Sequence, residues 1–320
     1  MAQASTSVEV EVEGRTLKLS NLDKVLWPAT GFTKGQVIDY YTRVAPALLP
    51  HMRDRPLTLK RYPNGVDADF FYEKQCPKHR PEWVAVAPLW ASGRGRWGAA
   101  PKEGKGEKII EYCLCNDVPT LVWVANLASL ELHTSLSQAS RIEQPTMVVF
   151  DLDPGPPAAV LECAQVALWL RGVLEHLGLQ SVIKTSGSKG LQLYVPLNTD
   201  GLTYEQTKPF AQALAQLLER EHPELVVSTQ DKSKRNGKVL IDWLQNDAAK
   251  TTVCVYSLRA RERPTVSTPV EWDEVSAAAE TGDADRMVFE AGDVIERVED
   301  KGDLFAPAVE LVQPLPSLSA

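Results

Sequence analysis

Residues 148–156 read VVFDLDPGP, a run of strand-forming residues that ends in two aspartates and a Pro-Gly break. Because side chains alternate between the two faces of a strand, Asp151 and Asp153 are expected on one side and Leu152 in the core. Two carboxylates this close repel each other, so either one stays protonated or a cation lies between them. Mg²⁺ and Mn²⁺ take oxygen ligands and keep positions open for phosphate oxygens. A turn after a solvated strand end is the simpler interpretation, so this stretch alone leaves the metal open.

The segments after this strand predict a split βαβ, ferredoxin-like module between residues 147 and 245. The expected order is the strand containing VVFDLD, a helix from Pro157 to Gly178, the strands SVIKT and LQLYVPL, the helix TYEQTKPFAQALAQLLERE, a basic hairpin QDKSKRNGK and the strand VLIDWLQ. If the first and last strands are neighbours, Asp242 joins the other two acids, and three acids suit a two-metal site. The loop 185–190, TSGSKG, offers amides, hydroxyls and a lysine to phosphates, although a flexible hairpin turn is the favoured interpretation of this loop alone.

The N-terminal half predicts a second group of strands and helices. The expected elements are a β-hairpin in SVEVEVEGRTLKLS, a helix capped by Thr33, a strand LTLKRYP, a mobile surface loop from Trp90 to Lys108, a strand KIIEYCLC, and a helix that runs into a strand carrying His133.

Composition indicates an ordinary soluble globular protein, with 320 residues of which 44% are hydrophobic and 24% charged. No stretch is apolar enough to span a membrane and no secretion signal is visible, so a cytoplasmic protein without a membrane partner is expected. Five cysteines without framework-like spacing favour reduced thiols. Cys76-x-x-His79 with Cys113-x-Cys115 could supply four zinc ligands, but the irregular spacing favours buried free thiols.

The net charge of −8 is concentrated near the C-terminus, where residues 271–310 hold 13 acids and 3 bases. Basic residues cluster elsewhere, within residues 53–61, 94–108, 232–238 and 259–263. Such clusters can neutralise phosphates even on an acidic protein, although many charged runs are solvated loops.

Several long motifs together resemble a known family. The motifs are, in chain order, NLDKVLWPATGFTK, RPLTLKRYPNGVDADFFYEK, LELH, VVFDLDPG, KTSGSKGLQLYVPL and KVLIDWLQN. Over roughly residues 15–305 they resemble the primase-polymerase domain of bacterial ligase D, a branch of the archaeo-eukaryotic primase superfamily. The resemblance implies an α+β, archaeo-eukaryotic primase-like fold, with two β-sheets flanked by helices around a central cleft and a ferredoxin/RRM-like catalytic module.

We expect the chain to divide into a primase-polymerase domain and a short tail. The expected parts are residues 1–305, comprising an N-terminal sheet module to about 140, a catalytic module over about 141–270 and an acidic segment 271–305, followed by a tail 306–320.

The resemblance also implies roles for individual residues. Asp151, Asp153 and Asp242 would be catalytic and would hold two Mg²⁺ or Mn²⁺ ions beside a nucleoside triphosphate. The positions implied for nucleotide binding are Lys60, Phe71, Tyr72, His133, Ser186, Lys189, Arg235, Gln245 and Arg259, and those implied for a DNA 5′-phosphate are Lys24 and Lys34. Without the resemblance these residues would be explained as a core histidine, solvated basic residues, core aromatics and a strand-end amide.

Two positions depart from the family pattern. Tyr72 stands where the family usually has phenylalanine, and Gln192 stands where histidine is common. The first change should preserve stacking and the second should leave the three acids intact, although the fit and the polarity of the pocket could differ.

The implied function is template-dependent nucleotidyl transfer that fills gaps or extends broken ends, with a preference for ribonucleotides. The implied partners are gapped or broken DNA with a 5′-phosphate, a separate ATP-dependent ligase and Ku, at the bacterial nucleoid. No Lys-x-Asp-Gly ligase motif is present, which predicts a stand-alone polymerase or an excised domain. A non-catalytic DNA-end scaffold and a sugar-nucleotide transferase are the alternatives.

Overall fold

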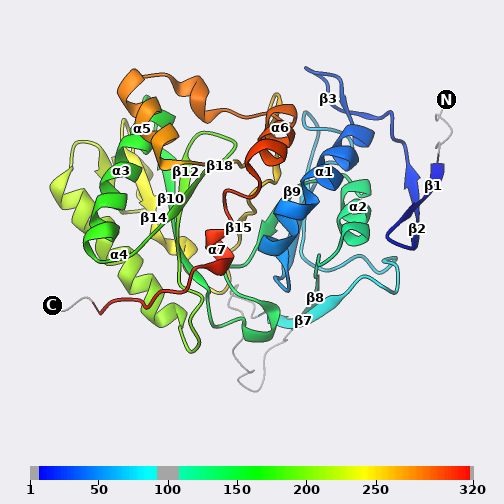
Figure 1. The fold of residues 1–320 in the computed structure, drawn as a ribbon, viewed down its shortest axis with the longest axis horizontal. Helices are drawn as coiled ribbons and strands as arrows, with labels where there is room; N and C mark the ends of the chain where they lie inside the picture. Colours follow the sequence, from blue (N-terminus) through cyan, green and yellow to red (C-terminus); the bar gives the residue numbers. More distant parts are fainter. Residues whose placement is uncertain (1–6, 92–107, 318–320) are drawn as a thin grey trace.

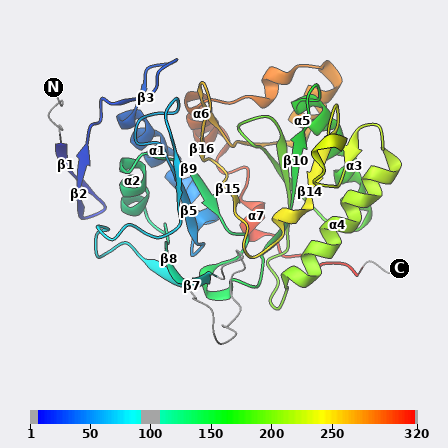
Figure 2. The ribbon, with the colours of Figure 1, turned by 180° about the vertical axis from the view of Figure 1, so that it is seen from behind.

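The computed structural model describes residues 7–91 and 108–317, and two six-stranded sheets stand side by side in it (Figure 1). Helices cover the outer side of each sheet, and the view from behind shows the same two halves exchanged (Figure 2). The α+β, two-sheet architecture expected from the sequence is therefore confirmed.

The first sheet, here called the N-terminal sheet, has the strand order β15-β9-β5-β8-β7, with β6 paired to β5. Its strands are β5 (Leu57–Arg61), β6 (Phe71–Glu73), β7 (Val86–Ala91), β8 (Lys108–Cys113), β9 (Ser129–Thr134) and β15 (Thr252–Val253). Helices α1 (Lys34–Met52) and α2 (Val118–Asn126) pack with it in one core. The Thr33 hydroxyl accepts a hydrogen bond from Gln36 N at 3.3 Å and thereby caps α1, as predicted.

Three short antiparallel pairs flank this sheet. They are β1 (Ser7–Val12) with β2 (Arg15–Ser20), β3 (Val25–Trp27) with β4 (Phe32–Thr33), and β16 (Leu258–Ala260) with β17 (Pro264–Val266). The first is the predicted hairpin, and its turn places Gly14 at φ 74°, a conformation that favours glycine.

The second sheet, here called the catalytic sheet, has the order β13-β14-β10-β12-β11-β18. Its strands are β10 (Met147–Pro154), β11 (Val182–Thr185), β12 (Leu191–Pro196), β13 (Val226–Val227), β14 (Val239–Asp242) and β18 (Pro269–Val270). The four central strands have the ferredoxin-like order, and α3 (Val160–His176) and α4 (Tyr204–Glu221) pack on one face.

The side chains of strand β10 alternate between the two faces of the catalytic sheet. Val148, Phe150 and Leu152 are fully buried against α3 and α4, whereas Met147 and Val149 point the other way, into the core shared with the N-terminal sheet. Asp151 and Asp153 continue this second row. The alternation inferred from VVFDLD is thus confirmed, with the carboxylates on the face toward the other half of the molecule.

Three local predictions for this region are wrong in detail. Helix α3 begins at Val160, three residues after Pro157, because Pro156 and Pro157 form a turn after the end of β10. The stretch 230–238 is no hairpin, because β13 and β14 run parallel and a two-strand hairpin requires antiparallel strands. The last strand ends at Asp242, since Trp243–Gln245 form a 3₁₀ turn. Residues 92–107 of the expected mobile loop lie outside the described residues.

The C-terminal segment ties the two halves together. It contains α5 (Trp272–Thr281), α6 (Ala291–Lys301) and α7 (Pro307–Glu310); α5 packs on α3, and α6 packs on α1 (Figure 1). The expected tail from residue 306 is partly packed, because Ala308 is fully buried and the Gln313 amide donates to Pro196 O at 2.7 Å. No helix in the described part of the chain is long and apolar enough to cross a bilayer.

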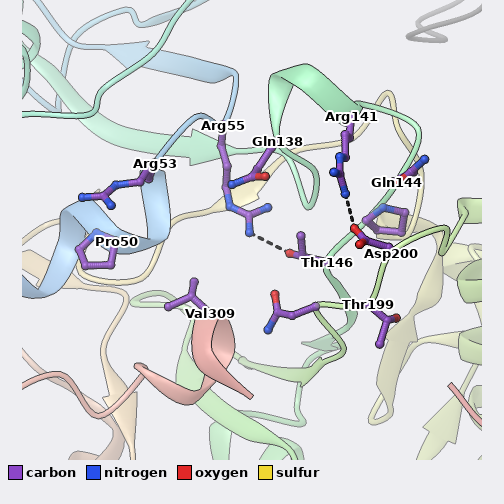
Figure 3. A pocket seen from close by; sticks show the side chains of 12 residues that line it. Pro50, Arg53, Arg55, Gln138, Arg141, Gln144, Thr146, Thr199, Asp200 and Val309 are labelled. Carbon is purple, nitrogen blue, oxygen red and sulfur yellow. Dashed lines mark hydrogen bonds and ion pairs between the residues drawn. The ribbon is translucent and has the colours of Figure 1, made fainter. Parts of the chain in front are cut away.

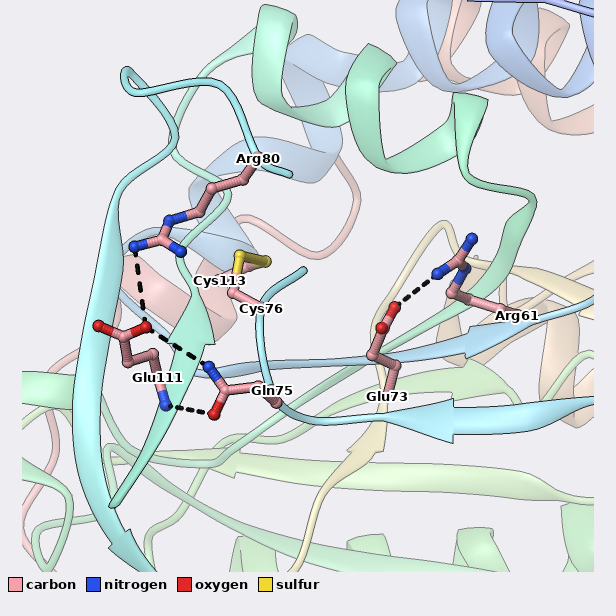
Figure 4. Close-up of a disulfide and its surroundings, with 7 residues drawn as sticks. All are labelled: Arg61, Glu73, Gln75, Cys76, Arg80, Glu111 and Cys113. Atoms are coloured by element: carbon pink, nitrogen blue, oxygen red, sulfur yellow. Dashed lines mark hydrogen bonds and ion pairs between the residues drawn. A yellow bond between two sulfur atoms is a disulfide. The ribbon is translucent and has the colours of Figure 1, made fainter. Parts of the chain in front are cut away.

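The prediction of five reduced thiols is wrong for one pair, since Cys76 and Cys113 form a disulfide (Figure 4). The Cys76 amide donates to Glu111 O at 2.7 Å, which lays the segment after β6 alongside β8 and brings the two Cα atoms to 5.0 Å. Spacing alone could not show this, because the cysteines are 37 residues apart. The remaining three, Cys115, Cys163 and Cys254, are free and buried.

We expect reduction of this disulfide to lower the free energy of unfolding by about 4 kcal/mol, because the bond restricts a long loop in the unfolded chain. Denaturant unfolding with and without reductant measures the difference. The matched control is the Cys76→Ser/Cys113→Ser protein, which the reductant should not affect. Five titratable thiols in the unfolded protein before any reductant is added, or equal stability under both conditions, would contradict the prediction.

Candidate active site

Three carboxylates converge on one face of the catalytic sheet. Strand β14 pairs with β10 in antiparallel register and places Asp242 directly opposite Asp151, so their β-carbons lie about 5 Å apart on the same face. Asp153 follows two residues along the same strand and shares that face. The adjacency that the sequence left conditional is confirmed.

Negative charge predominates in the cluster, although Arg235 and Arg259 partly offset it at Asp153. Burial, followed by the charges of Asp153 and Asp242, raises the pKa of Asp151 to about 7, and burial together with Asp242 also raises the pKa of Asp153. No cationic side chain among residues 7–91 and 108–317 forms an ion pair with any of the three acids. A divalent cation would offset this repulsion.

Neutral amides hold two of the acids. Asp242 accepts hydrogen bonds from Gln230 Nε2 at 2.9 Å, Leu244 N at 3.0 Å and Gln245 Nε2 at 2.9 Å. Asp151 accepts one from Gln192 Nε2 at 3.1 Å. Within the described ranges no three acidic, histidine or cysteine side chains form a ready ligand cage. The oxygen donors fit Mg²⁺ or Mn²⁺, and joint ligation would require Asp242 to exchange or share its amide contacts.

A pocket of about 440 Å³ opens beside the acids, between the catalytic sheet and strands β9 and β15 of the N-terminal sheet. Most of the residues predicted for the site line it, namely Asp151, Asp153, His133, Ser186, Lys189, Arg235, Gln245 and Arg259. Other predicted residues, namely Asp242, Lys60, Phe71 and Tyr72, lie outside this lining.

Two glycines allow cationic segments to approach the end of β10. A β-carbon at Gly155 would lie 1.9 Å from Arg235 O, and one at Gly190 would lie 1.9 Å from Leu152 O. Any larger residue would displace backbone at either position. These glycines therefore keep the Arg235 turn and the loop Ser186–Gly190 in contact with the carboxylate strand.

The loop and the turn leave donors for a ligand. The Ser186 hydroxyl accepts from Ser188 N at 3.2 Å and Gly190 N at 3.1 Å, so it shapes the loop, while Lys189 is exposed at the pocket. Arg235 donates through Nη2 to Gln230 O at 3.0 Å, and its buried Nε has no acceptor among the described residues. Lys189 and Arg235 are thus suited to an anionic ligand.

Glu131 organises the opposite wall and was not identified from the sequence. It is 2% exposed and contacts Lys60 Nζ at 3.1 Å, His133 Nε2 at 3.1 Å and Arg259 Nε at 3.3 Å. Burial alone would raise the pKa of Glu131, but the His133 hydrogen bond and the charges of Arg259 and Lys60 outweigh it and hold that pKa well below its usual range. The signal was present in LELH, because Glu131 and His133 lie on the same face of β9.

The predicted aromatic pair is divided between the two faces of β6. Phe71 is 43% exposed and lies beside Arg61, with the guanidinium carbon 5.2 Å from the ring centroid. Tyr72 lies on the other face, 5.9 Å from the His133 ring. Phe70, which was not predicted, accompanies Tyr72, and Lys60 Nζ lies 4.3 Å from its ring centroid. Base stacking by Phe71 and Tyr72 stays a prediction.

A buried lysine, Lys184, is linked to Asp151 through the side chain of Gln192. Lys184 is 1% exposed and donates to Gln192 Oε1 and to Ser267 Oγ at 2.6 Å. This contact fixes the orientation of the Gln192 amide, whose NH₂ group then faces Asp151. Burial lowers the pKa of Lys184 to about 7. Gln192, which stands where histidine is common in the family, therefore links Lys184 to Asp151 and helps to hold the Asp151 carboxylate in place.

Lys24 and Lys34 form a separate cationic cluster, with no place in the pocket lining. Lys34 N donates to Lys24 O at 2.8 Å, and Lys34 Nζ donates to Ser20 O at 2.7 Å. Burial, together with the charges of Lys24 and Arg61, lowers the pKa of Lys34 to about 8. The structure thus brings the two predicted lysines together and adds Arg61 to them.

Comparison with known proteins gives consistent results. A family model for the primase-polymerase domain of LigD matches residues 33–305. The multifunctional non-homologous end joining protein LigD of Mycolicibacterium smegmatis is 40% identical over 293 residues, and the bifunctional LigD of Bacillus subtilis is 32% identical over 286 residues. The matches cover 91% and 89% of this chain but only 36% and 43% of those proteins.

A solved structure is similar over nearly the whole chain. The polymerase domain of Mycobacterium tuberculosis ligase D, in complex with DNA, superimposes with a TM-score of 0.81 at 36% identity, covering 93% of this chain and 99% of that domain. The expected fold class is thereby confirmed. The chain belongs to the family of LigD primase-polymerase domains, which are DNA nucleotidyltransferases.

Proposed function

We propose that the chain is a template-dependent polymerase that fills short gaps or extends broken ends during DNA repair. The observation that carries the proposal is the row of three carboxylates on one face of the catalytic sheet, beside a pocket lined by Lys189, Arg235 and Arg259. End joining is stated for the LigD relatives, of which this chain spans 36–43%, and it is proposed here as the pathway, with excision-gap repair as the alternative.

In this proposal Asp151, Asp153 and Asp242 hold two Mg²⁺ or Mn²⁺ ions. The ions would lower the pKa of the primer 3′-hydroxyl and stabilise charge on the α-phosphate and the leaving pyrophosphate. Lys189 and the free Nε of Arg235 bind the triphosphate, and Arg259, held by Glu131 and by Ser186 O, supports the loop beneath it. Tyr72, Phe70 and His133 provide the surface for the base.

In this proposal the DNA is bound by the cluster of Lys24, Lys34 and Arg61. The cationic groups of Lys24 and Arg61 lie around the buried ammonium group of Lys34, and in this proposal the three form a site for the 5′-phosphate on the far side of a gap. A preference for ribonucleotides, a separate ATP-dependent ligase and Ku as partners, and a cytoplasmic location at the nucleoid complete the proposal. A DNA-end scaffold remains the competing function, because amides now occupy the oxygens of Asp242.

We expect faster extension on gapped duplex with a 5′-phosphate than on the same duplex with a 5′-hydroxyl, and we expect this preference to fall between pH 7 and pH 9. Lys34 has a pKa of about 8, so above that pH it is neutral and no longer attracts phosphate. Primer extension with ribo- and deoxynucleotides, in Mg²⁺ and in Mn²⁺, measures both effects.

The matched control is Lys34→Arg, because arginine stays charged across this range and should remove the pH trend. Synthesis without any phosphate preference would reject the phosphate site while leaving the polymerase assignment intact. DNA binding without synthesis in every combination of nucleotide and metal would establish the scaffold instead.

A further inference from the structure

A second pocket, of about 410 Å³, lies between the two halves of the molecule and shares no lining residue with the catalytic pocket (Figure 3). Its walls come from the end of α1 and the residues after it, from residues 138–146, from residues 198–200 and from α7. None of the residues predicted for catalysis, nucleotide binding or 5′-phosphate binding lies in it. We call it the interdomain pocket.

The lining carries an excess of positive charge. It contains Arg53, Arg55 and Arg141, and Asp200 is the sole acid among the described lining residues. Arg141 pairs with Asp200, which leaves two guanidinium groups without a carboxylate in the described part of the chain. Figure 3 shows the side chains of Arg55 and Arg141 on the same side of the pocket, above Thr146 and Asp200.

Arg55 is the informative residue, because it is 6% exposed and has no acidic partner among residues 7–91 and 108–317. It donates to Ser135 O at 3.3 Å and to Thr146 Oγ1 at 2.8 Å, which uses two of its five donor hydrogens. A buried charge costs several kcal/mol unless an opposite charge offsets it. Burial accordingly lowers the pKa of Arg55, and an anion in the pocket would supply the missing charge.

The polar and apolar groups around the arginines indicate the class of anion. A planar guanidinium matches phosphate oxygens in pairs. The volume is in the range of small-molecule sites and exceeds what an inorganic phosphate needs. Pro50, Pro145 and Val309 add apolar surface that a sugar or a base can cover.

We propose that the interdomain pocket binds the phosphate of a nucleotide, either free or at the end of a nucleic-acid strand. Arg55 contacts the phosphate, Arg141 exchanges its solvent-exposed partner Asp200 for the phosphate, and the apolar wall contacts the nucleoside. The site is independent of the proposed catalytic function, since it needs neither the acids nor the metal ions.

Photolabelling with 8-azido-ATP in EDTA, followed by peptide mapping, tests the proposal. We expect label on peptides within residues 138–146 or 198–200. We expect Arg141→Gln to reduce that label by about tenfold, the scale of a lost charge-assisted hydrogen bond. The matched control is Arg286→Gln, which removes a similarly exposed arginine–aspartate pair elsewhere and should leave the label unchanged. Arg55→Gln should also reduce the label, with its melting temperature measured in parallel because Arg55 is buried.

Competition separates the two sources of phosphate. Displacement by ATP but not by a 5′-phosphorylated oligonucleotide indicates a free nucleotide, and displacement by the oligonucleotide at lower concentration indicates a strand end. Absence of label from both segments, or a loss of label equal in Arg141→Gln and Arg286→Gln, overturns the proposal. Label confined to the catalytic pocket would also overturn it, while the polymerase assignment would be unaffected.

Discussion

Replacement of Asp151 by asparagine is expected to reduce nucleotidyl transfer by about 10³-fold or more, since bound metal contributes several kcal/mol to the transition state. Asparagine has nearly the same shape and can still accept from Gln192, so the substitution removes charge and little else. DNA binding should change little, because Lys24, Lys34 and Arg61 lie elsewhere. Primer extension and an equilibrium DNA-binding assay on the same preparation measure both.

The same substitution should stabilise the metal-free protein at neutral and higher pH. The pKa of Asp151 is raised in the folded state, so its ionisation costs stability as the pH rises from its unfolded pKa, about 4, to about 7. Asparagine cannot ionise and avoids that cost. Asp283→Asn, an exposed acid in the C-terminal segment, is the control. Retained synthesis by Asp151→Asn would reject the metal-ligand assignment.

Replacement of Glu131 by glutamine is expected to lower the free energy of unfolding by about 3–5 kcal/mol, since it leaves buried cations without a counter-charge. His133 and Arg259 lose their common anchor, and we therefore also expect a higher KM for the nucleoside triphosphate. Denaturant unfolding and steady-state primer extension measure the two effects.

The pH dependence of that loss follows from the low pKa of Glu131. A depressed carboxyl pKa stabilises the folded state above the unfolded pKa, about 4.3, and this contribution is lost as the pH falls through the folded pKa. The difference between wild type and Glu131→Gln should therefore be constant from pH 8 to about pH 5 and shrink below about pH 4.

The control for Glu131 is Glu73→Gln, which removes the partner of Arg61 at a less buried ion pair on β6. It should cost about 1 kcal/mol or less, as partly exposed pairs do. Equal losses for the two variants would show that Glu131 has no special role. An unchanged KM in Glu131→Gln would leave it a structural residue.

The sequence predicted the parts of the fold that depend on local alternation and on order along the chain. Strand β10 and the ferredoxin-like order followed from the apolar pattern around VVFDLD, and three acids on one face followed from strand pairing. Contacts that depend on register between distant segments could not be predicted this way. Glu131 was missed because two of its partners, Lys60 on β5 and Arg259 on β16, come from distant strands, and Cys76–Cys113 because both positions fit buried thiols.

The prediction of a hairpin at 230–238 was wrong for a related reason. A basic, Gly-containing stretch between two strands suits a hairpin turn, but β13 lies beside β14 in the same direction, so the chain must travel back before the second strand begins. Local residue preferences carry no information about strand direction. The roles of the individual pocket residues likewise depend on ligands, and they stay predictions.

Strand β15 belongs to the N-terminal sheet although it follows the catalytic sheet's β14 in the chain, and β18 then returns to the catalytic sheet. The polypeptide therefore crosses between the halves after most of each half has been synthesised. The N-terminal sheet lacks a strand until residue 253 has left the ribosome and the catalytic sheet until residue 270, so a shorter nascent chain exposes unfinished sheet edges to aggregation. The two halves should consequently acquire their final structure together, after residue 270 has been synthesised, and in one cooperative step.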